Sequence, residues 1–284
     1  MEHKIYHIDS FTDSPFQGNP TVTVFNAEAL SAVQMQAIAK EMNLSETGFI
    51  LPSQTADYRF RFFTRDGSEI DFCGHATVGG LSAIREEFGK TGSISIETNA
   101  GVLLCEIAQE NVTFEVPDVS FIPVELTHDI FENTMNIPTG ILDRSIPILQ
   151  NKNDRMVYFF INSMDDLANL SPSMSEIENL QKKCNFHVFC FATTDTDLDA
   201  MSRAFVPYVG VPEDPFTGSM QNGLISYLKE TGQIDKTKGS YSIGQGDFLG
   251  RKGRATITYS AESKAKLAAK AHILFSAKLY IHEE

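Results

Sequence analysis

The sequence lacks the excess of positive charge and the long apolar runs that mark several classes of protein. Its 284 residues include 37 acidic and 23 basic side chains, which gives a formal net charge of -14. Such a chain is not expected to bind nucleic acid, whose phosphates require Lys and Arg, or an anionic membrane surface. No run approaches the roughly 18 apolar residues that span a bilayer, and residues 1–8 are too polar for a signal peptide. A bound anion therefore needs a local field from helix ends and a few side chains.

Cysteine is also sparse. No Cys-x-x-Cys pair occurs among the four cysteines, which are Cys73, Cys105, Cys184 and Cys190. This usage favours a reduced, cytoplasmic protein. His7, His75 and Cys73 do not form a recognisable metal set, because zinc sites need about three or four convergent ligands. We therefore expect neither a metal nor a cofactor.

The most informative segment that is present covers residues 70–80. A short apolar strand is expected to end at Phe72, and a turn of Cys73, Gly74 and His75 then leads into a helix of small residues. Gly74 allows a tight turn, and the first amides of the helix point outward without partners in the helix. Such a helix end attracts anions. We expect this segment to hold a carboxylate or an enolate near a thiol and an imidazole.

A second segment, residues 212–220, repeats this plan. It runs from Pro212 through Glu213, Asp214 and a Thr217-Gly218-Ser219 turn into an amphipathic helix. Two helix ends of this kind that face one cleft would form a catalytic site.

Hydrophobic patterns predict alternating strands and helices on both sides of a weak boundary near residue 120. In the first half, strands are expected at residues 4–8, 21–25, 47–51, 58–63, 93–97, 102–107 and 112–116, and helices at residues 32–42 and after His75. In the second half, strands are expected at residues 156–161, 187–191, 202–206 and 254–259. A capping box of Ser173 and Glu176 predicts one helix, and a further helix carries Met220. Residues 261–271 look helical by propensity whereas residues 272–275 look extended, and the pattern leaves this open.

Several motifs resemble the PhzF-like phenazine-biosynthesis family, which shares its fold with diaminopimelate epimerase and proline racemase. In chain order they are His7-Ile8-Asp9-Ser10-Phe11-Thr12 with Pro15-Phe16-x-Gly18-Asn19-Pro20, Ser45-Glu46-Thr47, Cys73-Gly74-His75-Ala76-Thr77, Glu213-Asp214-Pro215-Phe216-Thr217-Gly218-Ser219 and Gly250-Arg251. The resemblance implies an α+β fold of two similar domains, each a mostly antiparallel sheet wrapped around a central helix, with the active site between them. We expect the domains at residues 1–119 and 120–271, with a last strand in residues 272–284 that returns to the first domain. The resemblance also implies a homodimer.

Glu46 is the first candidate catalytic residue. It lies between an expected helix end and the strand at residues 47–51, where a carboxylate could point into a cleft. A carboxylate that removes a proton from carbon works best with a raised pKa, which partial burial produces. On the sequence alone, a solvated loop residue or a capping residue is the favoured interpretation, and the resemblance to the family reverses this. The resemblance implies that Glu46 removes a proton from one carbon and returns it to another, without a cofactor.

The resemblance implies that His75, Asp214 and Ser219 surround the substrate together with Glu46. His75 and Asp214 are the further candidate catalytic residues, and the expected substrate-binding residues are Asn19, Gly74, Gly218, Ser219 and Arg251. Structural roles are open for several of them. His75 could bond a backbone carbonyl, Asp214 could form an Asx turn, and Ser219 could cap its helix. Arg251 could instead stabilise the sheet.

Cys73 occupies the position at which the related epimerases place the first of two catalytic thiols, but the second position is Thr217 here. A threonine hydroxyl is too weak an acid or base to replace a thiol unaided, so packing is favoured over catalysis for Cys73. Two segments depart from the common family pattern, Met220-Gln221-Asn222-Gly223 and Arg65-Asp66-Gly67-Ser68-Glu69, and the first resembles a subgroup of bacterial family members. We expect a cofactor-free isomerase that moves a proton between carbons of a small carboxylate. The alternatives are a thiol-dependent amino-acid epimerase or racemase and a non-catalytic metabolite- or protein-binding protein.

Overall fold

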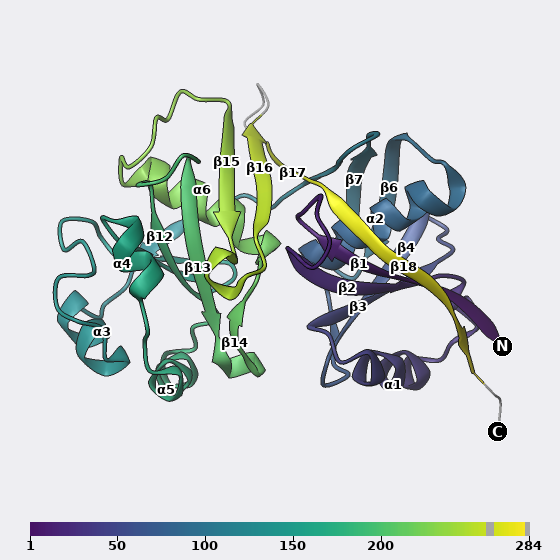
Figure 1. The fold of residues 1–284 in the computed structure, drawn as a ribbon, viewed down its shortest axis with the longest axis horizontal. Helices are drawn as coiled ribbons and strands as arrows, with labels where there is room; N and C mark the ends of the chain where they lie inside the picture. Colours follow the sequence, from purple (N-terminus) through teal and green to yellow (C-terminus); the bar gives the residue numbers. More distant parts are fainter. Residues whose placement is uncertain (260–263, 282–284) are drawn as a thin grey trace. The chain divides into compact units, whose positions relative to one another are not determined.

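The computed structural model describes residues 1–259 and 264–281. The chain divides into two compact units (Figure 1): unit 1 contains Met1–Glu115 and Lys266–Glu284, and unit 2 contains Val116–Ala265. Among the described residues, no helix is both long enough and apolar enough to cross a membrane.

Unit 1 is built on one mainly antiparallel sheet. The strands are β1 (Glu2–Ser10), β2 (Asn19–Val24), β3 (Glu46–Leu51), β4 (Tyr58–Thr64), β5 (Glu69–Ile70), β6 (Gly92–Thr98), β7 (Gly101–Ile107), β8 (Val112–Glu115), β17 (Ala265–Ala269) and β18 (Ala271–Tyr280). Their order across the sheet is β18-β1-β2-β3-β4-β6-β7-β8-β17, with short β5 paired on β4. Among the strand pairs just given, β2/β3 and β4/β6 are parallel and the others are antiparallel. In Figure 1, β18 (yellow) runs alongside β1 (purple).

The helix α2 (Gly74–Phe88) is the centre of unit 1. Every residue from Gly74 to Ile84 is buried, which is typical of a helix surrounded by protein on all sides. The helix contacts β1, β2 and β18 near one end of the strand order and β7 and β8 near the other, so the sheet wraps around it. Two mid-helix glycines allow this close packing. A Cβ on Gly80 would lie 2.5 Å from Cε2 of Phe60, and one on Gly79 would lie 2.5 Å from Cγ2 of Thr21.

The helix α1 (Ala32–Met42) covers the other face of this sheet, and its bounds confirm the prediction of a helix over residues 32–42. A capping box of Ser31 and Gln34 opens it. Its buried residues Met35 and Ile38 pack with apolar side chains of η1 (Ala27–Ala29) and of strands β1 to β4.

Unit 2 contains strands of mixed parallel and antiparallel pairing, with helices on both faces. Its strands are β9 (Phe121–Pro123), β10 (Leu149–Asn151), β11 (Val157–Phe160), β12 (Phe189–Thr193), β13 (Ala200–Val206), β14 (Val211–Asp214), β15 (Ser240–Gln245) and β16 (Gly253–Tyr259). Their order is β9-β10-β11-β12-β13-β15-β16, and β14 also pairs with β13. One face packs its Phe side chains against α3 (His128–Met135), α4 (Met164–Asn169) and α5 (Met174–Cys184).

The helix α6 (Gln221–Glu230) packs on the other face of the unit 2 sheet. Its Tyr227 ring stacks on Tyr158 of β11 at 5.6 Å between ring centroids and also contacts Phe121 of β9. Its Asn222 accepts a hydrogen bond from the Tyr259 hydroxyl of β16. Because α6 contacts strands from one end of this sheet to the other, it is the central helix of unit 2. The predicted α+β class, with a mostly antiparallel sheet around a central helix in each unit, is confirmed.

Several local predictions were wrong in detail. The strand expected to end at Phe72 is the two-residue strand β5, which ends at Ile70. Of the described residues of this segment, only Glu69 and Ile70 pair with β4, so the strand stops there. Ser173 is the N-cap residue of α5, but its side chain makes no capping bond. Its hydroxyl lies 3.2 Å from the Ser175 hydroxyl instead, so the predicted capping box does not form. Helix α6 begins at Gln221, after a single 3₁₀ turn, η3 (Gly218–Met220).

The ambiguous segment near the end of the chain is extended. Residues 265–269 form β17, which pairs with β8, so tertiary pairing overrides the helical propensity of this Ala- and Lys-rich stretch. The strand expected at residues 272–275 lies within β18. Residues 261–263 of the ambiguous stretch lie outside the described residues.

Candidate functional site

In unit 1, the side chains of Glu46, Cys73 and His75 meet at one point. The carboxylate Oε2 of Glu46 lies 3.1 Å from Nε2 of His75. The Cys73 sulfur lies 3.4 Å from Nδ1 and 3.8 Å from Nε2 of the same imidazole. His75 and Cys73 are buried, whereas the side chain of Glu46 is 20% exposed. The cluster is therefore enclosed on the side of the thiol and the imidazole, and it reaches solvent through the carboxylate.

Hydroxyl groups of neighbouring strands fix the backbone of this cluster. Ser10 at the end of β1 donates a 2.7 Å hydrogen bond to the carbonyl of His75. Thr21 in β2 donates a 3.0 Å bond to the carbonyl of Glu46, the first residue of β3. Asn19 is buried and pairs with Ser10 across the β1/β2 ladder. Gly74 is the first residue of α2 and is buried beside His75.

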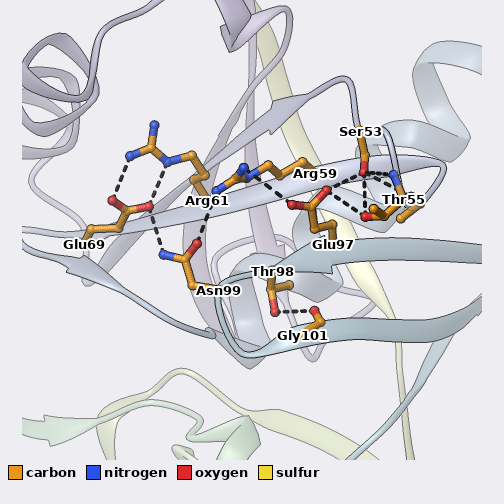
Figure 2. A network of polar contacts seen from close by, with 10 residues as sticks. Ser53, Thr55, Arg59, Arg61, Glu69, Glu97, Thr98, Asn99 and Gly101 are labelled. Atoms are coloured by element: carbon orange, nitrogen blue, oxygen red, sulfur yellow. Dashed lines mark hydrogen bonds and ion pairs between the residues drawn. The ribbon is translucent and has the colours of Figure 1, made fainter.

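The chain segment before Cys73 is held by a polar network (Figure 2). Glu69 of β5 accepts two hydrogen bonds of 2.7 Å from Arg61 of β4, an arrangement with two parallel bonds. Asn99 donates a further bond of 3.2 Å to Glu69, and Arg59 reaches both Asn99 and Glu97. The network attaches β5 to β4, three residues before the cysteine.

An aromatic contact fixes the residue that immediately precedes the cysteine. The ring of Phe72 packs edge-on against Phe62 and Phe114, at centroid distances of 6.1 and 5.9 Å. Polar and apolar contacts thus hold the segment that leads into the turn of Cys73 and His75.

The charges in this cluster follow from burial and from the groups in contact. Burial raises the pKa of the Cys73 thiol. Burial by itself lowers the pKa of His75, but the neighbouring Cys73 sulfur and Glu46 carboxylate outweigh it and raise the pKa of His75 well above its usual value. The neighbours of the His75 imidazole in this cluster therefore favour its protonated form.

In unit 2, Asp214 lies at the end of β14 in a turn that side chains hold in place. The Thr217 hydroxyl donates a 2.5 Å hydrogen bond to the Asp214 carboxylate. The amide of Gln245 donates to the carbonyl of Asp214 at 2.8 Å, and its oxygen accepts from the backbone N–H of Thr217 at 3.1 Å. Gln221 of α6 donates to Gln245 at 2.7 Å. Because both glutamines are fully buried, the turn is anchored to the interior of unit 2.

The other candidate residues of unit 2 lie around the same turn. Gly218 is buried and begins η3, whereas Ser219 is exposed. Ser219 is not the N-cap residue of η3 or of α6, so the capping role considered for it is wrong. Arg251 is half-buried, and its backbone N–H donates to the carbonyl of Gly246. A Cβ on Gly246 would lie 2.5 Å from the carbonyl oxygen of Pro215, so the loop before Arg251 packs directly on the Asp214 turn.

A buried ion pair supports β14 itself. Arg203 of β13 donates two hydrogen bonds, of 2.8 and 2.7 Å, to the carboxylate of Glu213, the residue next to Asp214. The same guanidinium donates to the carbonyls of Leu167 and Leu170 at the end of α4. The Arg203 and Glu213 side chains are only 10% and 9% exposed.

The candidate residues thus form two groups, one in each unit. Glu46 and Cys73 both contact His75 in unit 1, and Asp214 lies with the Gly218 turn in unit 2. The sequence reasoning missed the positioning residues, which are Ser10, Thr21, Gln221 and Gln245. A polar side chain within an otherwise buried element, as at Gln245 in β15, is the only signal that could have identified them.

Comparison with known proteins identifies the family. The profile of the family described as phenazine biosynthesis-like protein matches residues 8–276. An uncharacterised isomerase of Clostridium acetobutylicum is 30% identical over an alignment 301 residues long, which covers 99% of each chain. The trans-2,3-dihydro-3-hydroxyanthranilate isomerase of Pseudomonas chlororaphis is 32% identical, with 88% of each chain covered. The crystal structure of a PhzF-family phenazine biosynthesis protein from Bacillus anthracis superposes with a TM-score of 0.89 at 27% identity, over 99% of this chain and 100% of that one. Because the family match spans nearly the whole chain, this protein belongs to the phenazine biosynthesis-like PhzC-PhzF family.

Proposed function

We propose that this protein is a cofactor-independent isomerase that moves a proton between carbon atoms of a small carboxylate substrate. The observation that carries the proposal is the position of the Glu46 carboxylate, which lies 3.1 Å from the imidazole of His75 and is still partly exposed. A general base must reach the proton that it abstracts, and Glu46 is the cluster member that remains accessible. The isomerase names of the relatives support the same class of reaction.

In the proposed reaction, one oxygen of Glu46 takes a proton from a substrate carbon that is conjugated to a carboxylate. The electron pair of the broken C–H bond moves into the conjugated system and gives an enolate-like species. Glu46 then returns the same proton to a different carbon, so that no electron or atom is gained or lost. His75 donates a hydrogen bond that orients the Glu46 carboxylate, and the amides that begin α2 stabilise the negative charge on the substrate.

We propose that Asp214 orients the substrate and that Asn19, Gly74, Gly218, Ser219 and Arg251 bind it. For Asp214 and Ser219 this is what the resemblance to the family implies. The hydrogen bonds of Asp214 to Thr217 and of its carbonyl to Gln245 fix the turn, so its carboxylate is held in one orientation. The substrate of one relative is named as a dihydro-hydroxyanthranilate, a cyclic carboxylate, which supports a small cyclic carboxylate as the substrate class here.

The test is solvent exchange at carbon. The protein is incubated in deuterated water with a panel of small cyclic and acyclic carboxylates, and deuterium at carbon is followed by NMR and mass spectrometry. With a substrate found in this way, Glu46→Gln should fold normally and lose about 10²- to 10⁴-fold in turnover, the usual contribution of a general acid–base group. The matched control is Glu41→Gln, which removes an exposed carboxylate of α1 in the same unit. Exchange at the wild-type rate in Glu46→Gln would contradict the proposal.

A thiol-dependent epimerase or racemase is the second candidate, because the Cys73 sulfur lies 3.4 Å from His75. Burial keeps this thiol protonated, and the position that would need a second thiol is Thr217, whose hydroxyl is bonded to Asp214. Exchange that persists in Cys73→Ala excludes this candidate. The third candidate is a non-catalytic binding protein. It would bind a metabolite or a partner tightly, and Glu46→Gln would not change the affinity.

A further inference from the structure

The cluster in unit 1 combines three chemically different donor groups. A carboxylate oxygen of Glu46, the sulfur of Cys73 and a ring nitrogen of His75 all lie within 4.8 Å of one another. The reaction proposed above uses the carboxylate and the imidazole but gives the thiol no chemical step. Carboxylate, thiolate and imidazole are all ligands that zinc takes, and three protein ligands with one open position are typical of accessible zinc sites.

The distances in the cluster fit one metal ion. In a tetrahedral site with Zn–N near 2.0 Å, Zn–O near 2.1 Å and Zn–S near 2.3 Å, the ligand atoms are separated by about 3.3 to 3.6 Å. Here Nε2 of His75 lies 3.1 Å from the Glu46 oxygen and 3.8 Å from the Cys73 sulfur. The first separation is slightly shorter and the second slightly longer than this range, and the sulfur also lies 3.4 Å from Nδ1, so the imidazole has to turn for Nε2 to face both other ligands. The partly exposed Glu46 side chain lies on the open side, where an ion from solvent could enter.

We propose that Glu46, Cys73 and His75 bind one zinc ion from solution, through Oε2, Sγ and Nε2, and that this ion inhibits the protein. Binding releases the thiol proton and the proton on Nε2 to solvent, and it involves no change of oxidation state. The fourth position takes water. The inhibition rests on the proposed function: an ion that holds the Glu46 carboxylate withdraws the base from the substrate carbon.

Zinc binding is measured without any substrate. Zinc chloride is titrated by calorimetry into the full chain after treatment with a chelator and desalting. We expect one zinc ion per chain in the wild type, and in Cys73→Ser a loss of affinity of at least about tenfold, since even partners outside the ligand shell change zinc affinity by about 10- to 100-fold. The control is Cys184→Ser, which removes a half-exposed thiol at the end of α5 and should bind zinc like the wild type.

A second variant and a second metal make the test independent of one substitution. Glu46→Gln removes a different ligand of the same ion and should also weaken binding, even if Cys73→Ser does not fold. Cobalt(II) should give a thiolate-to-metal charge-transfer absorption in the wild type that is absent in Cys73→Ala. Wild-type zinc affinity in both Cys73→Ser and Glu46→Gln, or a loss of binding in Cys184→Ser, would overturn the proposal. Zinc binding without carbon exchange would refute only the isomerase function, and exchange without zinc binding would refute only the metal site.

Discussion

His75 is held by contacts on its ring and on its backbone. Its ring contacts Glu46 and Cys73, and its carbonyl accepts a hydrogen bond from Ser10. A ring held in this way keeps one orientation toward the Glu46 carboxylate, which is the preorganisation that the proposed proton transfer requires. Ser10 is therefore a positioning residue, because it acts on the site through the His75 backbone.

A second histidine, His187 in unit 2, provides a prediction about pH. Burial, together with the guanidinium of Arg155 that lies 2.8 Å from its Nε2, lowers the pKa of His187. The ordinary pKa of a histidine is about 6.5. As the pH falls below about 6.5, the unfolded chain therefore binds more protons at His187 than the folded chain does. The stability that the neutral imidazole contributes is complete above pH 6.5 and is lost as the pH falls below it.

We expect the melting temperature of His187→Gln to fall less than that of the wild type between pH 7.5 and pH 5.5. Calorimetry of both proteins at the two pH values gives this difference directly. His128→Gln, a substitution elsewhere in unit 2, is the control and should reproduce the wild-type difference. The prediction is wrong if the melting temperature of His187→Gln falls between the two pH values by as much as that of the wild type.

At this scale, the sequence singled out the members of the unit 1 cluster but not the residues that hold them. The motif around His75 itself contains a thiol and an imidazole, and the resemblance to the family singled out Glu46. The partner of Gln245 could not be recognised, because the contact depends on β15 bringing it to Asp214, 31 residues earlier in the chain. The contact between Glu46 and His75 is likewise set by the packing of β3 on α2 and by no local pattern.

Among the elements, β14 depends most clearly on a single side chain. This short strand carries Asp214, and Arg203 connects it to both β13 and the end of α4. When one partner of a buried ion pair is removed, the other charge is left buried and unpaired. The Arg203–Glu213 pair therefore fixes the strand from which the Asp214 turn starts.

We expect Arg203→Met to destabilise unit 2 by about 3–5 kcal/mol, the usual cost of breaking a buried pair. Arg254→Met is the matched control, since Arg254 makes two 2.7 Å bonds to Asp247 but is 42% exposed. An exposed pair of this kind contributes about 1 kcal/mol or less. Urea denaturation of the two variants in parallel measures the difference, and equal losses would contradict this account of β14.

Among the helices and strands, the spacing of hydrophobic residues predicted α1 correctly, whereas local propensity and a capping motif did not predict what the structure shows. The helical spacing of Met35 and Ile38 gave α1 with its correct bounds. The propensity of residues 261–271 favoured a helix and the pattern left the choice open, but residues 265–269 pair with β8 and form β17. Ser173 and Glu176 matched a capping box in sequence only, because the serine hydroxyl contacts Ser175 instead.

The path of the whole chain is set by its last two strands. After unit 2, β17 pairs with β8 and β18 pairs with β1 along its full length, from the pair Glu2 and Tyr280 to the pair Ser10 and Ala271. Unit 1 is therefore made from two separate parts of the sequence, whereas unit 2 is one continuous segment.

We expect a chain that stops after residue 270 to lose the order of unit 1 and to keep that of unit 2. Without β18, the backbone groups of β1 on that side lose their partners, and the sheet around α2 is opened. Hydrogen exchange followed by mass spectrometry should show faster exchange in β1, β2 and α2 and unchanged protection in β11 to β13. A chain that stops after residue 281 is the control. Wild-type protection of β1 in the shorter chain would contradict the prediction.

The pairing of β1 with β18 also sets an order of events during synthesis on the ribosome. Domains usually fold from the N-terminus as they are made. Here the first 115 residues emerge early, but the strand that completes their sheet is translated only after the whole of unit 2. The segment in the middle of the chain can therefore finish folding first, while β1 and the turn that carries His75 wait for the last strand. A nascent chain that is released early would contain a folded unit 2 and no complete Glu46 site.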